Sequence, residues 1–112
     1  IFMKEDKVYL KYILECIQKI EDNIACGHSM FMRSHLHQDA VLRNLHTLTE
    51  STQRISSKLK SEFSRVDWKG INAFRNVLVH DYLGIDLDRI WQIVSEDIPA
   101  LKKHILKMLT NV

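Results

Sequence analysis

The sequence has 112 residues, enough for one domain with one modest core rather than two. Hydrophobic residues make up 46% of the chain and charged residues 27%, as in an ordinary soluble globular protein. One Pro and three Gly leave little material for the turns of a many-stranded sheet, and no apolar run approaches the ~20 residues of a membrane helix. The net charge of +2 is compatible with a polyanionic substrate without demonstrating one.

The first residues lack the long apolar stretch of a secretory signal. Met3 is either the natural start, with Ile1 and Phe2 added before it, or an internal residue of a trimmed chain. Cys16 and Cys26 fall in one expected helix, which separates their Cα atoms by roughly 15 Å. A disulfide needs less than about 7 Å. Free thiols are therefore expected, which favours a reducing cytoplasm.

The first segment, residues 5–25, predicts a long amphipathic helix. Its apolar residues recur at steps of three and four, at Leu10, Ile13, Leu14, Ile17, Ile20 and Ile24. Gly27 is a suitable stop, and residues 27–33 are expected to form a connector. Three apolar side chains in that connector are expected to pack back onto the bundle, namely Met30, Phe31 and Met32.

A second helix is predicted to begin after Ser34, a good N-cap residue. Its stripe covers about six turns and comprises Val41, Leu45, Leu48, Thr52, Ile55 and Leu59. Residues 60–66 break the pattern. Asp67 is then a candidate N-cap for a third helix from Trp68 to about His80, whose apolar arc contains Ile71, Phe74, Val77 and Leu78.

The rest of the chain predicts a tight connector over residues 81–85, followed by a helix capped by Asp86. Pro99 lies where a proline starts or kinks a helix. We therefore expect residues 1–112 to form one all-α domain, an up-and-down antiparallel helical bundle. A second copy of so short a chain could cover leftover apolar surface, and we expect a homodimer.

Polar side chains gather on one arc of the third predicted helix. At 100° per residue, an arc of about 140° contains four polar residues, although two apolar residues, Trp68 and Val79, also fall inside it. The four are Asn72, Arg75, Asn76 and His80. One interpretation is simply a solvated face. The other is a site for phosphodiester chemistry.

The residue types favour that chemistry. His80 lies near the predicted helix C-terminus, and a histidine close to neutral pH can exchange protons in both directions. Arg75 offers a bidentate grip on phosphate. Tyr82 adds a hydroxyl where the chain leaves the helix.

The run Arg75-Asn76-Val77-Leu78-Val79-His80-Asp81-Tyr82 resembles the Arg-Asn-x-x-x-His-x-Tyr signature of HepT-like proteins of the HEPN superfamily. The flanks are similar to that family in the same order, at residues 41–45, 68–71, 83–86, 91–94 and 97–99. The resemblance covers nearly the whole chain. Arg-x-x-x-x-His alone is a weak pattern, but with the tyrosine and these flanks it is fairly specific.

The resemblance implies a helical homodimer in which two copies of the motif face each other across a cleft and cleave RNA without a metal or cofactor. His80 is then the acid or base at the ribose 2′-hydroxyl or the leaving oxygen. Arg75 stabilises charge on the phosphate, and Asn76 orients the phosphate or His80.

Members of this family are typically toxins paired with a minimal nucleotidyltransferase antitoxin. In such pairs the antitoxin transfers AMP to the motif tyrosine, here Tyr82, and a charged adduct would block the cleft. One departure concerns the second helix, where many relatives carry Gly-Glu-Ala and this chain carries Thr49-Glu50-Ser51. Glu50 is a possible neighbour of the site, like Asn72, or else a surface glutamate.

Two other interpretations compete with a metal-independent ribonuclease. Six histidines suggest a metal site, but His35 and His37 point about 200° apart on a helix. His28, His46 and His104 have no acidic or thiol partner at ligand spacing, so no metal is expected. The stronger alternative is a non-catalytic helical binding partner of a minimal nucleotidyltransferase, because fold and function are separable. The tryptophans and methionines are expected in the core or at dimer contacts.

Overall fold

The computed structural model describes residues 4–78 and 84–111, and within these ranges the secondary structure is helical with no strand. The elements in chain order are α1 (Lys4–Ile24), α2 (His28–Arg33), α3 (His35–Gln53), α4 (Ser57–Glu62), α5 (Trp68–Leu78), α6 (Leu87–Gln92), the π-helical turn η1 (Ile93–Asp97) and α7 (Ile98–Thr110). The expected all-α class is confirmed. No helix among the described residues is long and apolar enough to cross a membrane.

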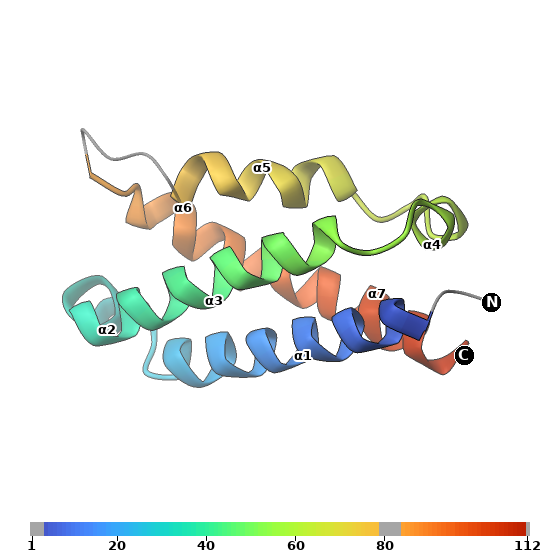
Figure 1. Cartoon of the computed structure of the whole chain (residues 1–112). Helices are drawn as coiled ribbons and strands as arrows, with labels where there is room; N and C mark the ends of the chain where they lie inside the picture. Colours follow the sequence, from blue (N-terminus) through green and yellow to red (C-terminus); the bar gives the residue numbers. More distant parts are fainter. Residues whose placement is uncertain (1–3, 79–83, 112) are drawn as a thin grey trace.

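The long helices alternate in direction, so the up-and-down antiparallel bundle is also confirmed (Figure 1). α3 lies between α1 and α5 and contacts both of them. α7 returns along α1 on another side of the bundle. α1 begins and α7 ends at the end of the bundle where α4 lies (Figure 1).

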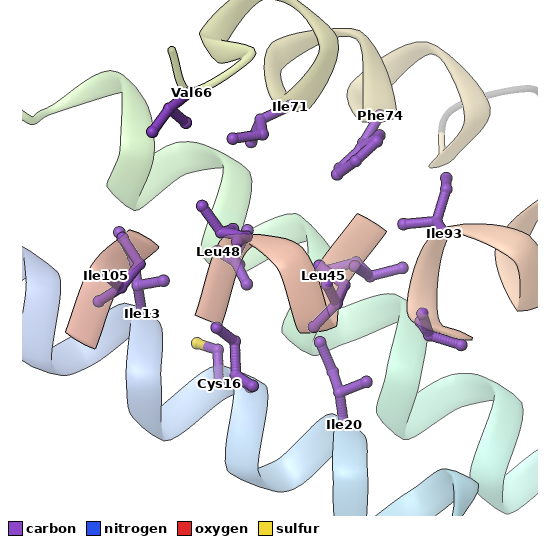
Figure 2. Packing of buried hydrophobic residues seen from close by; sticks show 14 of the residues in the cluster. Ile13, Cys16, Ile20, Leu45, Leu48, Val66, Ile71, Phe74, Ile93 and Ile105 are labelled. Carbon is purple, nitrogen blue, oxygen red and sulfur yellow. The ribbon is translucent and has the colours of Figure 1, made fainter. Parts of the chain in front are cut away.

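The core forms where the apolar stripes of these helices meet (Figure 2). Side chains from α1, α3, α5 and α7 all converge on it. The central members from α1 and α3 are fully buried, namely Leu10, Ile13, Ile17, Ile20, Val41, Leu45 and Leu48. Of the predicted α1 stripe, Leu14 and Ile24 are only partly buried. The three- and four-residue spacing thus predicted the buried face correctly.

The predicted connector over residues 27–33 is wrong in part, because His28–Arg33 form the short helix α2. Gly27 precedes it with φ at +90°, a backbone conformation that suits glycine. Phe31 is fully buried as expected, and the buried Gln38 side chain donates to its carbonyl oxygen at 2.9 Å. Met32 packs partly against the core, whereas Met30 is exposed, contrary to expectation.

The start of α3 is as predicted, since the Ser34 hydroxyl accepts a hydrogen bond from the His37 amide. The continuous six-turn helix is wrong. α3 ends at Gln53, and α4 begins after Ser56, whose backbone is extended. The buried Asp6 carboxylate of α1 accepts from the Ser56 amide at 2.8 Å and from its hydroxyl at 2.6 Å. This contact stabilises the break and explains why residues 60–62, expected to be irregular, are helical.

The later caps were predicted correctly. Asp67 accepts from the Gly70 amide at 2.9 Å where α5 begins, and Asp86 accepts from the Arg89 amide at 3.1 Å where α6 begins. Pro99 lies in the first turn of α7, after η1. The backbone is already helical at Gln92 and Asp97, so Pro99 lies inside a continuous helical run beside the π-helical turn and does not start a separate helix.

Both cysteines are free, as predicted, but their environments differ. Cys16 is buried in the core, and burial raises the pKa of its thiol. Cys26 is exposed in the turn between α1 and α2.

Candidate functional site

The polar arc predicted on the third helix is present on α5. Asn72, Arg75 and Asn76 are all exposed, while Ile71 and Phe74 from the opposite side of the helix are buried. The structure therefore places these three polar residues together on one helix face. His80 and Tyr82, the other two motif residues, lie outside the described residues.

The amide of Asn72 is held by the neighbouring helix. Gln53, the last residue of α3, donates from Nε2 to Asn72 Oδ1 at 2.5 Å. This contact marks where the two antiparallel helices lie level with each other. Each helix rises about 1.5 Å per residue, and the two helices run in opposite directions. Glu50 lies three residues before Gln53 and Arg75 lies three residues after Asn72, so Glu50 and Arg75 are at the same height along the bundle. That register supports Glu50 as a neighbour of the site, which remains a prediction.

Glu50 also has a partner that the sequence-based interpretation overlooked. His46 Nε2 lies 2.8 Å from Glu50 Oε1, one helical turn away. The expectation that His46 has no acidic partner is therefore wrong, because an i, i+4 pair on a helix brings the two side chains together. Both side chains are about half exposed, so this imidazole and carboxylate are accessible on the α3 surface.

A pocket of about 290 Å³ opens at the C-terminal end of the described α5. Its lining residues come from both sides of residues 79–83, namely Asn76, Val77, Gly84, Asp86 and Arg89. Arg89 was not predicted as a site residue. Its guanidinium lies 3.0 Å from Gln92 Oε1 and 3.8 Å from Asp97 Oδ2, so it is held at the pocket by α6 and η1. Arg75, the first residue of the predicted motif, lies on α5, and Arg89 lies on α6 beyond the end of the motif.

The charge on this face of α5 is positive and is not neutralised within the helix. α5 contains Lys69 and Arg75 and no acidic residue. Neither cation forms an ion pair with a carboxylate of the described residues. An exposed guanidinium with unused donors can bind a phosphate in a bidentate manner.

Metal ligands do not gather in the described part of the chain, where no group of three or more His, Cys, Asp or Glu side chains could hold an ion. His37, one of the histidines considered above, lies with Nδ1 at 3.1 Å from Asn23 Oδ1. That contact ties α3 to the end of α1.

The tryptophans pack as structural side chains. Trp91 lies against the ring of His28 at 5.0 Å and against that of Phe31 at 5.3 Å between centroids. Trp68 donates from its indole nitrogen to the Phe63 carbonyl oxygen at 3.1 Å. Both pack partly against the core, as expected.

Comparisons with known proteins point to one family. A family model described as Ribonuclease HepT-like matches residues 13–108. The chain is also 34% identical, over 97% of its length, to a Methanocaldococcus jannaschii protein named "Gamma-glutamylcyclotransferase and putative RNase". The match covers 50% of that relative, so the chain spans about half its length.

Two further relatives match along nearly their whole length. The "Probable ribonuclease HepT" of Thermococcus cleftensis is 32% identical over 94% of this chain and 96% of its own. The "Putative RNase" of Caldanaerobacter subterraneus subsp. tengcongensis is 30% identical over 96% of both chains. No solved structure matches.

Proposed function

The chain belongs to the ribonuclease HepT-like family, and from this premise we propose that it is a metal-independent endoribonuclease acting through Arg75, Asn76 and His80. The observation that carries the proposal is the exposed pair of Arg75 and Asn76 on one face of α5, with Asn76 four residues before His80 in the sequence. The names of the relatives support RNA as the substrate. One core shared by the helices supports a single domain over residues 1–112.

The reaction is a transesterification followed by release of the leaving strand. His80 takes the proton from the ribose 2′-hydroxyl or gives one to the leaving 5′-oxygen, and solvent water makes the other of these two proton transfers. The 2′-oxygen forms a bond to phosphorus as the bond from phosphorus to the 5′-oxygen breaks. The guanidinium of Arg75 stabilises the negative charge that grows on the non-bridging oxygens. Asn76 orients the phosphate or the imidazole through its amide.

We also propose that the active form is a homodimer in which two copies of this motif share a cleft. The exposed polar face of α5 supports this arrangement, because it leaves Arg75 and Asn76 accessible to a second chain. RNA is the first partner. The second is a minimal nucleotidyltransferase antitoxin that transfers AMP to Tyr82, which would place a charged adduct two residues from His80.

The test uses purified, unmodified protein with cellular RNA in excess chelator. The protein is expected to cleave, whereas His80→Ala should lower the rate by roughly 10²- to 10⁴-fold because the proton-transfer group is gone. His35→Ala is the matched control, since His35 is an exposed histidine at the start of α3 and should leave the rate unchanged.

Two other outcomes would contradict the proposal. Equal rates for the His80→Ala variant and the unmodified protein would overturn the role of His80. No cleavage by either, with intact mass excluding AMP on Tyr82, would favour the binding module. Under that alternative, Tyr82→Phe changes the complex with the nucleotidyltransferase and His80→Ala does not.

A further inference from the structure

Positive charge is concentrated in one part of the chain. Residues 53–76 contain six Lys or Arg and two Asp or Glu, a net charge of +4. The other residues contain ten basic and twelve acidic side chains, a net charge of −2. The charged segment runs from the end of α3 through α4 to the polar face of α5.

The centre of this segment is hollowed. A broad, open groove of about 700 Å³ lies between α4 and the first turn of α5, and we call it the basic groove. Lys60, Arg65, Trp68 and Lys69 line it together with Ser57, Ser61, Ser64, Val66 and Asp67. Arg65 and Lys69 are exposed, so their charges face solvent. The hydroxyls of Ser57, Ser61 and Ser64 add hydrogen-bond donors to the groove.

Arg65 and Lys69, the exposed cations of the basic groove, form no ion pair with a carboxylate of the described residues. The ion pairs among the described residues lie elsewhere, in α1 with α7, within α3, and between α6 and η1. The Lys60 ammonium lies 5.6 Å from the centre of the Trp68 ring, a distance that allows a cation–π interaction. Asp67, the acidic lining residue, already accepts the Gly70 amide as a helix cap.

The basic groove is continuous with the candidate site. A second hollow of about 330 Å³ shares Lys60, Trp68 and Lys69 with it and extends to Asn72. Asn76 follows Asn72 by one helical turn on the same face. From Lys69 to Arg75 the helix rises about 9 Å, a distance that a few nucleotides can cover.

We propose that the basic groove binds the sugar–phosphate backbone of single-stranded RNA beside the scissile bond, with Arg65 and Lys69 as the main phosphate contacts. The inference rests on the proposed ribonuclease function and adds to it a binding site outside the motif. Free cations along a groove are typical of proteins that follow a nucleic-acid backbone without reading its sequence. A single strand suits this surface because the groove is open and is lined by one short stretch of the chain, residues 57–69.

Binding is measured by fluorescence anisotropy in the His80→Ala background, so that the RNA stays intact. The probe is a labelled single-stranded RNA 12-mer, titrated from low to high salt. Arg65→Gln with Lys69→Gln should weaken binding several-fold at low salt. Two lost phosphate contacts should also flatten the plot of log affinity against log salt concentration by about 1.4.

The matched control carries Lys103→Gln with Lys107→Gln, which removes the same charge from exposed positions on α7. The control should keep the affinity and the salt dependence of the parent. Equal losses in both double variants would overturn the proposal, because net charge alone would then explain the binding. Equal affinity of the parent for poly-glutamate of matched length would overturn the assignment to RNA. Thermal unfolding of all variants checks that they are folded.

Cleavage assays separate the two proposals. In the catalytically intact background, the groove variant should lower kcat/KM on long RNA several-fold more than kcat/KM on a dinucleotide, since a dinucleotide does not reach the groove. If the parent cleaves nothing but the anisotropy pattern is as expected, the ribonuclease proposal fails and the basic groove stands. If the parent cleaves and the groove variant binds and cleaves like the control, the basic groove fails alone.

Discussion

α1 and α5 flank the same central helix but present different surfaces. α1 is 21 residues long, buries four apolar side chains completely and carries five acidic and four basic residues. α5 has 11 residues, buries Ile71 and Phe74, and carries two basic residues and no acidic one. On the α1 side, close apolar packing excludes water from the interface between the helices. The shorter contact on the α5 side leaves a polar, cationic face available for chemistry.

The largest expected contrast is in thiol reactivity. Cys16 lies in the sealed core of α1 with a raised thiol pKa, because burial disfavours the thiolate. Cys26 is exposed in the turn that follows this helix. A thiol reagent should modify Cys26 at least ~1000-fold faster, since Cys16 reacts only when the core opens. Peptide mass spectrometry over time measures both rates, and comparable rates would mean that the α1 side is not sealed.

A core truncation tests the same side by stability. Leu48→Ala removes a fully buried side chain at the centre of the bundle and should lower the free energy of unfolding by about 2–5 kcal/mol. Leu36 is 83% exposed, so Leu36→Ala should change it by less than ~0.5 kcal/mol. Urea denaturation of both variants gives the comparison. A similar loss in the two would contradict the assigned core.

The contact of Asp6 with Ser56 joins α1 to the start of α4. Asp6→Ala removes a carboxylate that accepts two hydrogen bonds and should lower the free energy of unfolding by about 1.5–3 kcal/mol. Asp39→Ala, at an exposed position of α3, is the matched control. Loss of the contact should also raise hydrogen exchange at the Ser56 and Leu59 amides, because the capped start of α4 loosens. Unchanged exchange there would show that α4 does not depend on α1.

The smallest effect is expected at the ion pair of Glu21 with Lys102. Its atoms lie 2.9 Å apart, but each side chain is more than a third exposed, so the coupling should be about 0.2–1 kcal/mol. A double-mutant cycle with Glu21→Gln and Lys102→Met measures it. The coupling should shrink at high salt. A coupling of several kcal/mol would mean that charge, as well as apolar packing, holds α7 on α1.

What the sequence predicted well was local. The stripe of α1 and the caps at Ser34, Asp67 and Asp86 depend on residues within a few positions of one another. The break between α3 and α4 is stabilised by Asp6, which is 50 residues from Ser56 in the sequence. The apolar periodicity contains no sign of this contact and therefore predicted one continuous helix.

In the candidate site, too, the residues placed by local helical spacing were predicted, and those placed by contacts between helices were not. Asn72, Arg75 and Asn76 share a face by helical spacing alone and were predicted together. Gln53 and Arg89 reach this region through contacts between helices, which no spacing within α5 reveals. The basic groove was also missed. Its cations lie on α4, on α5 and in the turn between them, and spacing within one helix does not show that they line one hollow.

The position of the two chain ends has a practical consequence. α1 begins and α7 ends at the α4 end of the bundle, the end that holds the basic groove (Figure 1). An affinity tag, a fusion partner or a surface tether joined at either terminus would therefore stand beside that groove and could obstruct a long ligand. Cys26, in the turn between α1 and α2 at the opposite end, is a better place to immobilise the protein or attach a dye.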